Sequence, residues 1–258
     1  MRHAILTMLL LLLSGVGSPV WAVVAIDATT TATTTGIQNP SFTHTPVGTP
    51  TLVTVHVMKR QSASVSSVTY GGTTMTIAAA AGRTVAIRAA IYQLASPPSG
   101  AQTVVVNTSS ASFDAVLVAQ TYTGTHATSP TSGAQQFQRT GLTTDTLTIV
   151  SNAGDLVVDT VASGGASITH TPGAGQTEQW DATVTTISGA GSTKAGGASV
   201  TVLQTLSATD SWRYVALNVG VNAAPAAPVH APGPPAAPAL DQYGGFSTVP
   251  VAGGTGKW

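Results

Sequence analysis

The chain of 258 residues contains no cysteine, and only 7% of its residues are charged. Disulfides, a thiolate nucleophile and a cysteine-ligated metal are therefore excluded. An ordinary soluble domain has roughly 25% charged residues, so this surface is unusually neutral. Nine basic residues balance nine acidic ones, which gives a net charge of zero. This balance removes the electrostatic basis for binding nucleic acid or an anionic membrane surface.

Long apolar runs are also scarce, and the clearest one lies at the N-terminus. Arg2 and His3 precede an apolar stretch from Ile5 to Leu13, and Val20-Trp21-Ala22 offers small residues for cleavage. This pattern predicts a secretory signal peptide at residues 1–22, because the apolar run is too short to span a bilayer. We therefore expect a secreted bacterial protein, extracellular or at the cell surface, with no membrane association in its mature form.

Helical patterns are missing too, whereas threonine is abundant. No window keeps apolar residues at i, i+3, i+4 and i+7, and β-branched residues favour strands. Runs of strand length follow one another between Gly, Pro and Ser turns. The Thr-rich stretch 29–35 is either an extended edge segment or an O-glycosylated spacer. We expect strands at 23–27, 51–58, 65–70, 73–77, 84–94, 102–107, 113–123, 146–150, 156–159, 183–187, 199–206 and 212–221. In the last of these, the period of two places Val215, Leu217 and Val219 on one face and Trp212 and Tyr214 on the other.

These runs predict an all-β fold, an antiparallel two-sheet sandwich that is jelly-roll-like and occupies residues 23–222. A Pro-rich C-terminal extension follows. Residues 223–239 form an Ala/Pro-rich linker, which we expect to be extended and semi-rigid. Residues 240–258 form a tail that is too short for a core of its own.

Four phrases of the sequence carry a resemblance. They are Ser67–Thr76 with its Tyr-Gly-Gly turn, Ile91–Gly100 with its Ser-Pro-Pro-Ser-Gly turn, Gln120–Gly124, and Gly154–Asp159. Together they resemble a little-characterised β-sandwich module of secreted bacterial surface proteins and phage-derived fibre proteins. The resemblance covers about residues 23–222 and implies an extracellular sandwich. It implies no catalytic or ligand-binding residue.

Carboxylate chemistry finds little support in the sequence. Glu178 is the one glutamate, and Asp155 and Asp159 lie on one predicted strand. A rise of about 3.3 Å per residue separates two such residues by roughly 13 Å, too far for a catalytic pair. We interpret Asp155 as a turn residue and Asp159 as solvent-facing. Calcium ligands could come from Asp27, Asp155, Asp159 and Asp181, but there is no Asp-x-Asp-x-Asp loop and we predict no cofactor.

The histidines are scattered as well. His44, His56, His126 and His170 lack metal-ligand spacing. His56 lies on the strand face opposite Val53, Val55 and Val57, so we interpret it as exposed. A Ser-His-Asp triad stays open because serine and aspartate are common, although no Gly-x-Ser-x-Gly elbow occurs. The prediction is a protein that is not an enzyme.

The favoured hypothesis is an extracellular structural or adhesive protein that self-assembles into a surface filament by strand or tail exchange. Its partners are then further copies of the chain, in a homo-oligomer or homopolymer. Two segments outside the expected core supply the predicted subunit contacts: Val24 and Ile26 near the mature N-terminus, and Tyr243, Phe246, Val249 and Val251 in the tail.

The alternative is a lectin-like module that binds surface glycans. Its predicted sugar contacts are Tyr122 and Trp180, with Tyr70, Tyr92 and Trp212 as further candidates, because aromatic rings stack on sugar faces.

Overall fold

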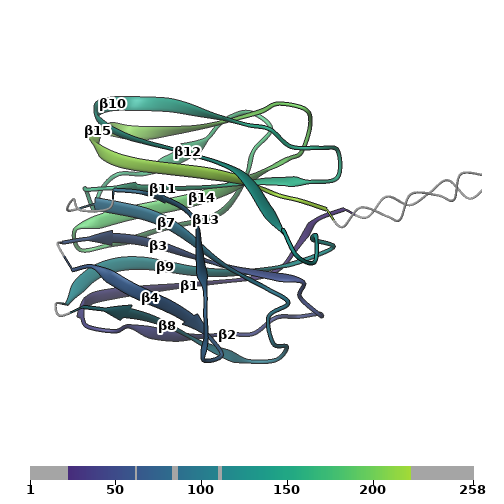
Figure 1. Ribbon diagram of the computed structural model, residues 1–258. Coiled ribbons are helices and arrows are strands. Elements are labelled where there is room, and N and C mark those ends of the chain that lie inside the picture. Colours follow the sequence, from purple (N-terminus) through teal and green to yellow (C-terminus); the bar gives the residue numbers. More distant parts are fainter. Residues whose placement is uncertain (1–22, 62, 83–86, 110–111, 222–258) are drawn as a thin grey trace, which may run out of the picture. The chain divides into compact units, whose positions relative to one another are not determined.

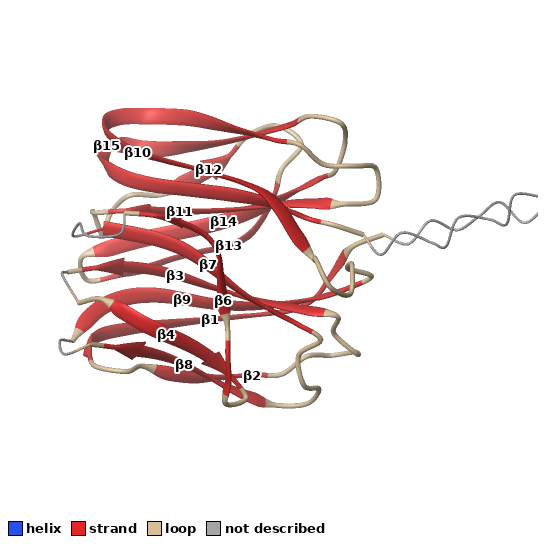
Figure 2. Cartoon of the chain, in the orientation of Figure 1, coloured by secondary structure: helices blue, strands red, loops and turns tan. Residues whose placement is uncertain are grey.

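The computed structural model describes residues 23–221 except 62, 83–86 and 110–111, and all of them belong to one compact unit. The predicted signal peptide, linker and tail lie outside the described residues. Figure 2 shows that the described residues form strands and loops, with no helix among them. That part of the chain accordingly contains no helix that is long and apolar enough to cross a membrane.

The first half of the unit contains nine strands in two sheets (Figure 1). A five-stranded sheet has the order β1-β9-β3-β7-β6, and a four-stranded sheet has the order β2-β8-β4-β5. Every strand pair is antiparallel. The strands are β1 (Ala25–Ile37), β2 (Ser41–His44), β3 (Leu52–Arg60), β4 (Val65–Tyr70), β5 (Thr73–Thr74), β6 (Thr76–Ala81), β7 (Ile87–Ala95), β8 (Gln102–Thr108) and β9 (Phe113–Thr123).

The second half repeats this order, with two long strands, β10 of 19 residues and β15 of 20 residues. Its inner sheet is β10-β15-β11-β14-β13, and β12 pairs with the first part of β15. β10 and β15 pair in two stretches with an irregularity between them. One stretch belongs to the inner sheet, and the other forms, with β12, a second layer of this half. The strands are β10 (Thr131–Ile149), β11 (Leu156–Ser163), β12 (His170–Pro172), β13 (Thr177–Val184), β14 (Ile187–Ala195) and β15 (Val200–Val219).

The order β1-β9-β3-β7 facing β2-β8-β4-β5 is that of a jelly roll, in which two four-stranded sheets form a sandwich. The predicted antiparallel, jelly-roll-like sandwich is therefore confirmed. The described residues contain two such rolls stacked sheet on sheet, so there are four layers where the strand pattern predicted two. The pattern gave the strands but not their partners, and a repeat with little shared sequence leaves no periodic signal.

Three hydrophobic clusters fill the spaces between the four layers. The inner sheets are buried on both faces, as the last strand illustrates. Val215, Leu217 and Val219 pack into the cluster between the rolls, whereas Trp212 and Tyr214 pack inside the second roll. This split confirms the two faces that the period of two predicted for this strand.

Several strand boundaries differ from the predicted ones. The hairpin from Val65 is confirmed at its turn, where Gly71 and Gly72 both have positive φ. The predicted strand 183–187 is wrong, because residues 185 and 186 form the turn between β13 and β14. The predicted strands 199–206 and 212–221 are one strand, β15, and β10 begins at Thr131 instead of 146. The edge-segment reading of 29–35 is confirmed, since β1 ends a sheet.

The two rolls are related by an approximate two-fold arrangement. Their contacts are reciprocal: β1 meets β13 as β10 meets β6, and β3 meets β14 as β11 meets β7. His56 and Thr160 occupy the same position, four residues into β3 and β11, and they meet across the interface. His56 Nδ1 lies 2.5 Å from Thr160 Oγ1. Equivalent positions of the two rolls therefore contact each other here, as they do at a two-fold axis.

His56 is fully buried there, so its predicted exposure is wrong. Its Nε2 lies 2.9 Å from Thr54 Oγ1, which in turn contacts the Tyr122 hydroxyl at 3.2 Å. Val53, Val55 and Val57 pack inside the first roll, so His56 was correctly placed on the opposite face. That face is covered by the second roll, which the sequence pattern could not reveal. Burial lowers the pKa of His56 to about 3.

Acid sensitivity follows from this lowered pKa. An imidazole whose folded pKa lies below its unfolded value stabilises the fold above pH 6.5 and loses that contribution as the pH falls toward 3. We expect the stability advantage of wild type over His56→Gln to shrink by about 2 kcal/mol between pH 7 and pH 5. Urea denaturation at both pH values measures it, and a constant difference would contradict the buried neutral histidine.

Candidate functional site

The predicted subunit contacts at the N-terminus are not free. Val24 is buried, and its amide donates to the Gly154 carbonyl oxygen at 3.0 Å. Ile26 is half-buried in β1 and pairs with Tyr122 of β9. The segment 23–36 is thus no loose arm for exchange; it is the edge strand of its own sheet. The predicted contacts Tyr243, Phe246, Val249 and Val251 lie outside the described residues.

The candidate aromatic side chains that the structure describes offer no exposed platform for a sugar. Tyr122 is fully buried and donates a hydrogen bond to Gln120 Oε1 at 3.0 Å. Trp180 is 6% exposed and lies edge-on to His56 between the two rolls. Tyr70, Tyr92 and Trp212 are buried as well. This placement does not support the predicted sugar face, since stacking needs an accessible ring.

Ser163, His170 and Asp181 do come together, although nothing in their spacing indicated it. Ser163 Oγ lies 3.0 Å from His170 Nε2, and His170 Nδ1 lies 3.7 Å from Asp181 Oδ1. Ser163 Oγ also contacts Ser188 Oγ at 2.6 Å, and Ser188 Oγ donates to the Gly165 carbonyl oxygen. Both serines are fully buried. Attack on a substrate requires access to the hydroxyl, so this cluster serves the packing of the second roll.

Among the described residues, Asp159 is the carboxylate with the most hydrogen-bond donors around it. Its predicted solvent-facing position is wrong because it is fully buried. It accepts hydrogen bonds from the Tyr214 hydroxyl at 2.7 Å and the Ser192 amide at 2.7 Å. Ser192 Oγ, Gln176 Nε2 and Gln204 Nε2 are further donors. Burial raises the pKa of Asp159 to about 6, and the hydrogen bonds partly oppose this shift.

The other aspartates of the calcium hypothesis lie in separate clusters. Asp27 accepts from the amides of Val47 and Gly48, and Asp155 accepts from the Asn152 amide as part of a turn. Within the part of the chain that the structure describes, no three metal-ligating side chains gather at one point.

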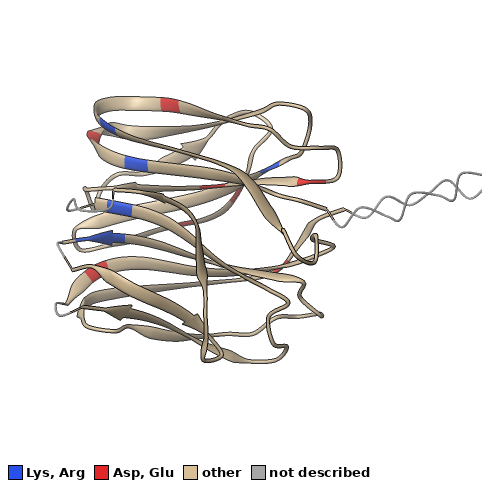
Figure 3. Cartoon of the chain, viewed as in Figure 1, with Lys and Arg blue, Asp and Glu red and all other residues tan. Residues whose placement is uncertain are grey.

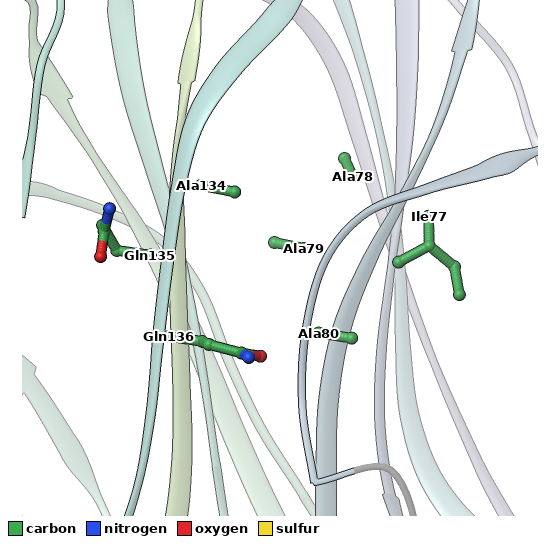
Figure 4. Close-up of a pocket in the computed structure, with 7 residues that line it drawn as sticks. All are labelled: Ile77, Ala78, Ala79, Ala80, Ala134, Gln135 and Gln136. Atoms are coloured by element: carbon green, nitrogen blue, oxygen red, sulfur yellow. The ribbon is translucent and has the colours of Figure 1, made fainter.

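A groove of about 320 Å³ lies between the edge strands β6 and β10. Figure 4 shows Ala134 and Gln136 directed from β10 toward β6, whereas Gln135 points away. The seven lining residues are Ile77–Ala80 and Ala134–Gln136, and none of them is charged or aromatic. With neither a titratable group nor a ring, this groove has no chemistry of its own.

The unpaired strand edges differ in how well they are protected. Bulges interrupt β6 between Ile77 and Ala79, β10 between Ser132 and Gln135, and β13 between Glu178 and Trp180. Bulges and charges on an edge strand block the addition of a further strand. β13 also carries two acidic residues, and the remaining sheet-end strands, β2, β5 and β12, have four residues or fewer.

β1 also carries Asp27 and two bulges, between Ile26 and Ala28 and between Thr34 and Ile37, but these lie toward its two ends. Its pairing with β9 is regular from Ala28 to Thr34, and this stretch contains only alanine and threonine. A slot of about 250 Å³ opens beside it, between β1 and β2, lined by Ala32, Thr33, Thr34, Ile37, Asn39, Pro40, Ser41, Phe42 and Leu117. An uncharged regular edge next to a slot with both apolar and polar lining is the geometry that an added strand uses, with main-chain pairing on one side and side-chain sockets on the other. We call it the β1 edge.

No family model, curated protein or solved structure matches the chain.

A pH dependence of opposite sign to that of His56 follows for Asp159. A carboxyl whose folded pKa is raised stabilises the fold at low pH, and this contribution is lost as the pH rises through 6. The Asn side chain of Asp159→Asn keeps the shape of the carboxyl but does not titrate. We therefore expect the free energy of unfolding of wild type, relative to that of Asp159→Asn, to rise by about 1 kcal/mol when the pH is lowered from 7 to 5. Guanidinium unfolding curves of both proteins test it; parallel pH profiles would show that the buried carboxyl keeps an ordinary pKa.

Proposed function

We propose that this chain is a non-enzymatic extracellular structural protein whose copies associate through the β1 edge. One observation carries the proposal: between its two bulges β1 has a regular, uncharged and unpaired stretch from Ala28 to Thr34. The shorter edge strands β6 and β13 are interrupted by a bulge within their length, and β10 carries both charges and bulges. Because proteins commonly protect such edges, an unprotected one points to a partner strand.

The partner that fits best is the β1 edge of a second copy. Two identical edges pair antiparallel about a two-fold axis, so each copy offers the same surface. Such pairing joins two five-stranded sheets into one continuous sheet. The neutral surface supports it, since a net charge of zero leaves little repulsion between copies.

The slot beside β1 adds an apolar component to this contact. Ala32 and Phe42 are only partly buried, although they pack against the core cluster of the first roll, and Ile37 is 50% exposed. A neighbouring strand would cover them and remove their apolar surface from water.

A two-fold contact closes a dimer, so growth into a filament requires a second contact. The tail 240–258 remains the predicted source of that contact. Secretion rests on the N-terminal pattern of residues 1–22, and the surface-protein resemblance agrees with it.

Lysine in the middle of the β1 edge tests the proposal. In Thr31→Lys, a side chain that is already exposed gains a charge, and the two-fold pairing brings two such charges close together. We expect the association to weaken about tenfold or more, which corresponds to at least about 1.4 kcal/mol. Sedimentation velocity over a concentration series measures it.

The matched control is Thr103→Lys in β8, an exposed threonine on a strand that is paired on both sides. It should associate like wild type. Equal association of the two lysine variants, or a wild type that stays monomeric throughout the series, would overturn the proposal.

Deletion of residues 240–258 separates the two contacts. We expect the truncated protein to keep its dimers and lose any longer filaments in negatively stained secreted material. Loss of the dimer itself would show instead that the tail occupies the β1 edge.

A further inference from the structure

Two cations lie side by side inside the first roll without a counter-ion. Lys59 of β3 and Arg88 of β7 are direct cross-strand partners. Lys59 is 3% exposed and Arg88 is 7% exposed. Figure 3 shows that the basic segments of β3 and β7 lie at the same end of the sheet. Like charges directly opposite each other destabilise a strand pair, and burial increases that cost.

The hydrogen bonds of the pair leave most donors unused. Lys59 Nζ donates to the Gln61 carbonyl oxygen at 2.7 Å, and Arg88 Nη2 donates to the Tyr92 hydroxyl at 3.2 Å. Arg88 Nε is buried and has no partner. A guanidinium has five N–H donors, so this one retains free donors in a site that excludes water.

No acidic side chain among the described residues forms an ion pair with either cation. The nearest carboxylate in the pairing pattern is Asp114, which pairs with Arg60 across β3 and β9 and therefore lies on the opposite face of the sheet. Its oxygens accept from the Gly36 amide and the Thr186 hydroxyl, toward the second roll. The interior around Lys59 and Arg88 is otherwise apolar, with Val57, Ala90 and Ala115 nearby.

Burial and the charge of Arg88 lower the pKa of Lys59 to about 8. The ammonium form therefore still predominates at neutral pH, and the repulsion persists. A chain with so few charges would gain stability by replacing one of these two with an apolar residue. Side by side and buried, the two cations carry positive charge that no described ion pair balances.

We propose that Lys59 and Arg88 form a binding site for a small oxyanion, namely a carboxylate, sulfate or phosphate group held between the ammonium and the guanidinium. A guanidinium binds two oxygens of such a group with its planar fork, and an ammonium adds a point charge beside it. The anion would neutralise the pair and use the free Nε–H of Arg88.

Thermal unfolding in sodium phosphate, against sodium chloride at equal ionic strength, tests the site. We expect phosphate to raise the unfolding midpoint of wild type by several degrees more than it raises those of Lys59→Met and Arg88→Met. The control is Lys194→Met, because Lys194 Nζ also donates to a main-chain carbonyl oxygen but lies outside the pair. It should respond like wild type. Phosphate also stabilises folded proteins in general, and this effect cancels when the shifts of wild type and the variants are compared.

The unfolding temperature in the absence of phosphate is a second readout, and the expected change is opposite to the one that an ordinary structural role of Lys59 would give. In chloride alone, Lys59→Met should unfold at a higher temperature than wild type, because it removes an unbalanced buried charge. Titration calorimetry with phosphate, sulfate and glucuronate should show binding to wild type at least tenfold tighter than to either methionine variant. The ligand that binds most tightly shows whether the site prefers an inorganic anion or an acidic sugar.

Equal phosphate responses of wild type and both methionine variants, or no heat of binding with wild type, would overturn the site. Should Lys59→Met fail to fold, Arg88→Gln provides the same comparison. The site is independent of the β1 edge, so Thr31→Lys should bind phosphate like wild type.

Discussion

The structure depends above all on the burial of both faces of its two inner sheets. Each inner sheet packs on one side against the outer layer of its own roll and on the other side against the opposite roll. Strands such as β3 and β15 are therefore apolar on both sides, and a polar group on either face must find a partner inside the protein. This constraint explains why so many polar side chains of the chain are buried.

Neutral hydrogen bonds replace ion pairs in this setting. His56 is held between Thr54 and Thr160, and Asp159 is surrounded by tyrosine, serine and glutamine donors. Threonine suits this role because its methyl group packs in the core while its hydroxyl bonds to a neighbour. In the described residues, carboxylates that are buried rely on such donors instead of on lysine or arginine. Lys59 and Arg88 differ from this pattern, because they are two buried cations for which the described residues provide no counter-ion.

The edges of the sheets show a related division. β13 and β10 carry charges and bulges, and β6 carries a bulge, all of which discourage the addition of a strand. Between its bulges β1 has only alanine and threonine, and it flanks an open slot that includes the apolar side chains of Ile37, Phe42 and Leu117. The Thr-rich stretch that looks like low complexity in the sequence is thus the part of the sheet best suited to meet another chain.

The all-β class, the antiparallel sandwich and most strands could be predicted from the residues alone, because a period of two and Gly/Pro turns are local signals. The period of two placed Val215, Leu217 and Val219 on one face and Trp212 and Tyr214 on the other. The sequence could not show that the strands form two rolls, since pairing between residues far apart leaves no local pattern. Tertiary structure alone buried His56, Asp159 and Tyr122, assembled Ser163 with His170, and brought Lys59 opposite Arg88. Each of these depends on what covers the second face of a strand, and that is decided by packing between elements.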